Sequence, residues 1–103
     1  MIDIKGIGLL NGEEEEIVNR VTNEYYGKLE RMDKSMQKLD IHVKTYDTDG
    51  KRKRYSVQAK IVSPARNFNA DETDWDLSKA LHKVLKKLMN ELEKRYHYSD
   101  HGH

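Results

Sequence analysis

The sequence predicts an α+β fold, a two-layer sandwich in which two helices pack on one face of a four-stranded, mostly antiparallel sheet. Two long segments carry apolar residues at helical spacing, and four short segments alternate apolar with polar residues. Their order is β-α-β-β-β-α, and each segment offers one apolar face, so a single shared layer buries them all. Residues 1–96 are expected to form this single domain, and residues 97–103 a flexible C-terminal tail.

The N-terminal part predicts a short strand followed by a helix. Apolar and polar residues alternate over Met1–Lys5. Asn11, with Glu14 three residues later, is a helix-cap signal, and the run Glu13–Glu16 suits the positive end of a helix dipole. We favour this role over a cation site because four consecutive side chains splay around a helix. The predicted apolar stripe comprises Ile17, Val18, Val21, Tyr25, Leu29 and Met32.

The middle of the chain predicts an antiparallel hairpin and a further strand. Leu39–Tyr46 and Tyr55–Ile61 alternate apolar and polar residues on either side of the turn signal Thr48–Gly50. Pro64 ends the second strand, because proline has no N–H to donate to the ladder. A short fourth strand is expected at Asn67–Asp71.

The longest amphipathic segment runs from Thr73 to about Tyr96. Thr73 followed by Asp76 predicts a capping box at its start. The apolar stripe that should lie on the sheet comprises Leu77, Ala80, Leu81, Val84, Leu85, Leu88 and Leu92. The opposite side is predicted to present ammonium groups that point outward together, from Lys79, Lys83, Lys86, Lys87 and Lys94.

The charge distribution makes the second half of the chain the candidate anion-binding half. The net charge of the 103 residues is only +1. Residues 1–50, however, hold 7 Lys/Arg against 11 Asp/Glu, and residues 51–103 hold 12 against 7. Besides the helix lysines, a basic hairpin tip contributes Lys51, Arg52, Lys53 and Arg54. Such clusters predict salt-sensitive, sequence-independent phosphate binding, although exposed lysines also serve simply to solvate a surface.

Aromatic residues near the hairpin add a second signal for nucleic acid. Tyr46 is placed to stack on bases, whereas the strand phase of Tyr55 predicts a core position.

The sequence contains no pattern that predicts catalysis, a cofactor or a metal site. There is no cysteine, glycine-rich phosphate loop or nucleophile elbow. Asp47–Gly50 resembles the start of a calcium loop but lacks its later ligands, so a turn is favoured. His97, His101 and His103 have no preorganised fourth ligand, and His42 and His82 are expected to be solvated surface residues.

No apolar run approaches the length of a membrane span, and the N-terminus lacks a secretory signal pattern. We therefore expect a non-enzymatic cytoplasmic protein.

The order and spacing of several segments resemble the ribosome hibernation-promoting factor family in its short form. The resemblance rests on Tyr26–Glu30, Tyr55–Pro64, Asn67–Asp71 and the pattern of Asp76–Leu92. It implies a fold similar to double-stranded RNA-binding domains and binding to small-subunit rRNA in the channel used by mRNA and tRNA, which blocks translation in idle cells. The contacts it implies come from Lys79, Lys83, Lys86 and Lys87. The first helix departs from the family pattern, because it begins with acidic residues and is nearly charge-balanced.

Two functional hypotheses follow from the sequence. The first is a ribosome- or RNA-binding module that contacts the small subunit through the basic helix face. The second is a protein-interaction domain of the same fold that self-associates, for example as a homodimer, without binding RNA.

Overall fold

The predicted order of elements is present in the computed structural model, which describes residues 1–6, 8, 10–48, 52–64 and 66–101, with side chains placed for all of these except 47–48 and 96–101. The elements are β1 (Ile2–Lys5), α1 (Gly12–Met32), β2 (Lys38–Thr48), β3 (Arg52–Val62), β4 (Phe68–Asp74) and α2 (Leu77–His101).

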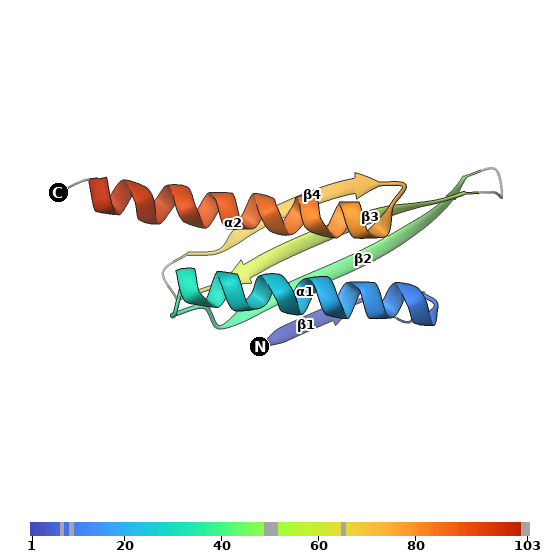
Figure 1. Ribbon diagram of the computed structural model, residues 1–103, viewed down its shortest axis with the longest axis horizontal. Coiled ribbons are helices and arrows are strands. Elements are labelled where there is room, and N and C mark those ends of the chain that lie inside the picture. Colours follow the sequence, from blue (N-terminus) through green and yellow to red (C-terminus); the bar gives the residue numbers. More distant parts are fainter. Residues whose placement is uncertain (7, 9, 49–51, 65, 102–103) are drawn as a thin grey trace.

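The four strands form one mixed sheet in the order β1-β2-β3-β4. β1 is parallel to β2, with Ile2 opposite Leu39, and the other neighbours are antiparallel. Both helices lie on the same face of the sheet, and the opposite face is left uncovered by any helix (Figure 1). The predicted two-layer α+β architecture is therefore confirmed.

The core lies between the helices and the inner face of the sheet. Each predicted helix stripe enters it: Val18, Val21, Tyr25 and Leu29 of α1 are buried, with Ile17 and Met32 at the margin. The whole predicted stripe of α2 is buried: Leu77, Ala80, Leu81, Val84, Leu85, Leu88 and Leu92. Burial of each such leucine favours folding by about 1.5–3 kcal/mol, so this stripe fixes which side of α2 faces the sheet.

The start of α1 is held by the predicted cap. Asn11 Oδ1 accepts a hydrogen bond from the Glu14 amide at 2.8 Å, and Glu14 Oε1 accepts one from the Asn11 amide at 3.0 Å. This reciprocal pair is a capping box, which satisfies two amide groups that the helix itself cannot.

The predicted start of the last helix is wrong. Thr73 does not cap it, because β4 continues to Asp74 and Thr73 lies opposite Ser56 in the sheet. Asp76 is the cap: its Oδ1 accepts a hydrogen bond from the Lys79 amide at 3.0 Å. The inward positions at the end of β4 are Glu72 and Asp74, so the strand's continuation carried no apolar signal.

The hairpin is longer than the sequence pattern indicated. β2 extends to Thr48, although its predicted end was Tyr46. β3 begins at Arg52, although its predicted start was Tyr55. The turn residues 49–51 lie outside the described residues. The distal end of the hairpin projects past the ends of both helices (Figure 1). At the C-terminus, α2 continues to His101, and the flexibility of residues 97–103 stays a prediction.

Gly6 and Gly27 differ in whether the structure leaves room for a side chain. Gly6 has a φ of +86°, and a Cβ added there would lie 2.0 Å from the Val43 carbonyl oxygen. Gly27 is inside α1, and a Cβ there would meet nothing within 4 Å. Only Gly6 is therefore required by the backbone.

We predict that Gly27→Ala raises the free energy of unfolding by about 0.5–1 kcal/mol, because alanine loses less conformational entropy in a helix. The same change at Gly6 should lower it by more than about 1 kcal/mol, because φ and the Val43 carbonyl both oppose a Cβ. Urea unfolding followed by circular dichroism measures both. A loss of stability in Gly27→Ala would contradict the open space found beside it.

Candidate nucleic-acid interface

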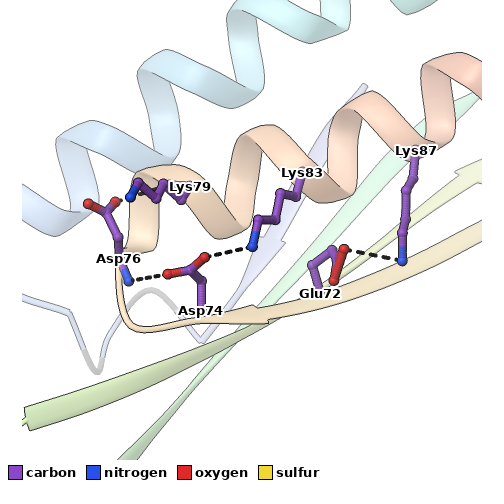
Figure 2. A network of polar contacts seen from close by, with 6 residues as sticks. All are labelled: Glu72, Asp74, Asp76, Lys79, Lys83 and Lys87. Atoms are coloured by element: carbon purple, nitrogen blue, oxygen red, sulfur yellow. Dashed lines mark hydrogen bonds and ion pairs between the residues drawn. The ribbon is translucent and has the colours of Figure 1, made fainter.

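Two of the lysines expected to point outward from α2 lie instead against β4. Lys83 Nζ is 2.7 Å from Asp74 Oδ2, and Lys87 Nζ is 3.3 Å from Glu72 Oε1 (Figure 2). Lys87 Nζ also donates to the backbone carbonyl of Asp71 at 3.3 Å. The expectation that all the ammonium groups point outward together is therefore wrong for Lys83 and Lys87. Their positive charge is largely matched within the molecule.

The contact between Lys83 and Asp74 shifts the pKa of both groups. The hydrogen bond from Lys83 lowers the pKa of the Asp74 carboxyl, helped by the amide of Asp76, which donates to Asp74 Oδ1 at 2.9 Å. The same hydrogen bond, with the charge of Asp74, raises the pKa of Lys83. Both residues therefore stay ionised and paired at neutral pH.

The remaining lysines of α2 form what we call the α2 ridge, defined as Lys79, Lys86 and Lys94. All three are exposed, and none forms an ion pair with another residue in the described part of the chain. Spacings of seven and eight residues place them about 10 and 12 Å apart along the helix axis. Each exceeds the Debye length of about 8 Å at physiological salt, so the three positive charges are largely screened from one another.

The basic residues of the hairpin are divided between the two faces of the sheet. Arg52, Lys53 and Arg54 lie in β3 rather than in the turn, so consecutive side chains point in opposite directions. Lys53 lies on the helix side, with Nζ 3.7 Å from Glu14 Oε1. Arg52 and Arg54 lie on the outer side. Lys51, the fourth predicted residue, lies outside the described residues.

Lys53 belongs to a polar cluster that ties the hairpin to α1. The capping residue Glu14 is only 8% exposed, and its Oε2 accepts a hydrogen bond from the Tyr55 hydroxyl. Burial alone would raise the pKa of Glu14, but the Tyr55 hydroxyl, the Asn11 amide and Lys53 together outweigh it and lower that pKa. Burial and the bond to Glu14 raise the pKa of Tyr55 to about 12. Tyr55 packs at the edge of the core, as its strand phase predicted.

Trp75 is a surface residue that sequence reasoning missed. It lies between β4 and α2, is 43% exposed, and has the guanidinium carbon of Arg52 4.5 Å and that of Arg54 5.9 Å from its ring centroid. Tyr46, for which base stacking was predicted, is 51% exposed on the same outer face, opposite Arg54. The available signal was the single tryptophan of the chain, placed between two aspartates in a connector.

The two histidines whose side chains the structure describes differ from each other. His42 is half-buried on the outer face of the sheet. His82 is exposed, as expected, but its Nδ1 lies 3.2 Å from the Tyr25 hydroxyl, and the two rings make an edge contact. His82 therefore links α2 to α1 instead of being only solvated.

Within the described residues, no group of three or more histidine, aspartate or glutamate side chains is arranged to hold a metal ion. Neither helix, over the part that the structure describes, is long and apolar enough to cross a bilayer.

Comparison with known proteins identifies the family. The family model of the sigma 54 modulation protein / S30EA ribosomal protein family matches residues 12–98. The chain belongs to this family. The resemblance to ribosome hibernation-promoting factors is therefore confirmed. Among curated proteins, no sequence matches this chain.

A solved structure shares the fold of this family member. A ribosomal subunit interface protein from Coxiella burnetii superposes with a TM-score of 0.63 at 18% sequence identity, covering 92% of this chain and 96% of that one. At this identity the likeness concerns the fold alone. The S30EA family match spans α1, the hairpin and the lysines of α2, so every candidate contact lies within the matched region.

We predict that Tyr55→Phe lowers the free energy of unfolding by about 1–2 kcal/mol at pH 7, because it removes a hydrogen bond to an ionised, buried carboxylate. Glu14 has a lowered pKa, so its contribution is present above the ordinary value of 4.5 and is lost as pH falls through the lowered value. The difference from the parent should therefore shrink below pH 4.5.

Tyr46→Phe is the matched control for this experiment, since the Tyr46 side chain is exposed; its effect should stay within about 0.5 kcal/mol. Urea unfolding at a series of pH values measures both variants. Equal effects of the two substitutions at pH 7 would contradict the assigned role of the Glu14–Tyr55 contact.

Proposed function

We propose that this protein is a non-enzymatic, ribosome-associated factor of the cytoplasm that binds small-subunit rRNA and restrains translation. The observation that carries the proposal is the match of residues 12–98 to the S30EA ribosomal protein family. The fold shared with a ribosomal subunit interface protein is consistent with it.

The α2 ridge supports RNA as the partner. Lys79, Lys86 and Lys94 present exposed ammonium groups on the side of the helix opposite the buried leucine stripe. Ammonium groups on a rigid helix can neutralise RNA phosphates without base recognition, which suits a partner whose surface is mostly backbone. Because α2 is fixed on the sheet, the ridge needs little ordering on binding, and this lowers the entropic cost.

The other predicted lysines are assigned a smaller part. Lys83 and Lys87 must exchange the carboxylates of Asp74 and Glu72 for phosphates before they contribute. Lys53 has the same competition from Glu14. We therefore propose that the α2 ridge supplies most of the electrostatic affinity, and that the paired lysines orient β4 and the hairpin.

The structure contains a feature that opposes the alternative of self-association through β4. Glu72 and Asp74 are charged residues on the inward side of this edge strand, a pattern that discourages edge-to-edge pairing. RNA binding is accordingly the function that we develop.

We predict that Lys79→Glu/Lys86→Glu abolishes co-sedimentation with small ribosomal subunits at low salt, because each reversal replaces a phosphate attraction with a repulsion. The matched control is Lys34→Glu/Lys60→Glu, which changes the net charge equally at exposed positions away from α2. The control should co-sediment nearly as well as the parent. If the α2 variant sediments like the parent, the proposed interface is wrong; if both variants fail, net charge rather than the ridge governs binding.

A further inference from the structure

The outer face of the sheet carries an unassigned cluster of aromatic and arginine side chains. The large exposed hydrophobic residues of the described chain are Met1, Tyr46 and Trp75, and two of these three share this face. No helix covers the face (Figure 1), and the cluster lies toward the hairpin end of the sheet, where Tyr46 is paired with Arg54. Its position is therefore open to a large partner.

The sheet register brings the cluster together. Tyr46 of β2 lies opposite Arg54 of β3. Tyr55 lies opposite Asp74, and β3 and β4 are antiparallel, so Arg54, which precedes Tyr55, lies beside Trp75, which follows Asp74. Arg52 is two residues from Arg54 on the same strand and points to the same side. The two guanidinium carbons lie 4.5 and 5.9 Å from the Trp75 ring centroid. We call these four residues the arginine–aromatic cluster.

The carboxylates closest in sequence to Trp75 do not face this cluster. Asp74 Oδ2 contacts Lys83 on the helix side, and Asp76 Oδ1 accepts the amide of Lys79 at the helix start. The next row of the outer face holds Lys44, opposite Ser56. The cluster therefore combines flat aromatic surfaces with the guanidinium groups of Arg52 and Arg54.

This combination fits unpaired nucleobases better than it fits a protein. Bases stack on tyrosine and tryptophan rings, and arginine contacts the flanking phosphates. A cation–π contact accounts for the arginines on Trp75, but not for an indole that remains 43% exposed with an exposed tyrosine in the same row. Tryptophan, tyrosine and arginine are also common in protein-binding hot spots, which lie at the centre of a well-packed patch. The adjoining row here is Lys44, Ser56 and Thr73, which adds no large apolar side chain to build such a patch.

The rest of the outer face sets the limit of the site. A shallow depression farther along the sheet is lined by side chains of mixed charge, among them Lys5, Lys60, Asp40 and Asp71. Cations and carboxylates are balanced there, so phosphates gain little. The site is therefore confined to the hairpin end and is long enough for a few nucleotides.

We propose that the arginine–aromatic cluster binds single-stranded RNA, with bases stacked on Trp75 and Tyr46 and phosphates contacted by Arg52 and Arg54. This inference rests on the proposed function, in which the partner is ribosomal RNA, and adds a second contact on the side of the molecule away from the α2 ridge. The protein thereby touches a structured RNA surface with one layer and an unpaired segment with the other.

Trp75 is the single tryptophan of the chain, so its fluorescence reports on this site directly. We predict that hexaadenylate quenches the fluorescence of the parent in a saturable manner, and that a blunt RNA duplex at equal phosphate concentration does not. By anisotropy of labelled hexaadenylate, Trp75→Leu and Tyr46→Leu should each weaken binding about tenfold, the loss of one stacked base. Trp75→Phe should restore part of the affinity.

Arg54→Gln should also weaken binding, whereas the control Arg20→Gln, an exposed arginine on α1, should not. Circular dichroism of each variant checks that the fold is retained. Absence of quenching, equal quenching by the duplex, or an unchanged affinity in Trp75→Leu would overturn the inference. The result is separable from the proposed function: parent protein that co-sediments with small subunits but does not bind hexaadenylate leaves the ribosomal role standing and removes only this site.

Discussion

The rotation of α2 about its own axis is the constraint on which the arrangement of its lysines depends. Leu81, Leu85 and Leu88 are fully buried against the sheet, and turning the helix by one residue, about 100°, would bring them to the surface. Each exposed leucine would cost about 1.5–3 kcal/mol, which is large beside the total stability of a small domain. The directions of the Cα–Cβ bonds of the lysines on α2 are consequences of this apolar constraint, because these bonds cannot turn without moving the leucines.

The same rotation explains why the basic face is divided. The inward positions at the end of β4 are carboxylates, and the fixed helix holds Lys83 and Lys87 above them (Figure 2). These pairs cover the polar end of an edge strand, and they partly neutralise two lysines whose side chains remain 51% and 53% exposed. Lys79 and Lys86 lie farther around the helix, Lys94 lies farther along it, and all three stay exposed. The rotation of α2 about its axis thus sets both the packing of its leucines and the positions of its lysines.

The sequence was sufficient to predict what depends on neighbours along the chain. Helical and strand periodicity predicted both helix stripes and the order of the elements along the chain, and the spacing of Asn11 and Glu14 predicted the cap, because burial and capping act over a few residues. It was not sufficient where strand register decides. The partners of Lys83 and Lys87 depend on how far β4 continues, and Thr73 was misplaced because Glu72 and Asp74 broke the apolar alternation.

In the candidate interface, too, some positions follow from local sequence and others depend on strand pairing. That Arg52 and Arg54 point away from Lys53 follows from strand alternation, and it was missed only because the hairpin was predicted too short. The position of Trp75 beside the arginines requires the pairing of β3 with β4, which no local pattern contains. The RNA-binding roles of all these residues stay predictions.

The most direct test of the central claim compares two lysines of the same helix. The affinity for small ribosomal subunits is measured over a salt series for Lys86→Gln and Lys83→Gln. Because Lys86 is exposed and Lys83 is held by Asp74, the account predicts that Lys86→Gln reduces the slope of log K against log salt by about 0.7–0.9, and that Lys83→Gln leaves it nearly unchanged. Equal reductions in both variants would contradict it.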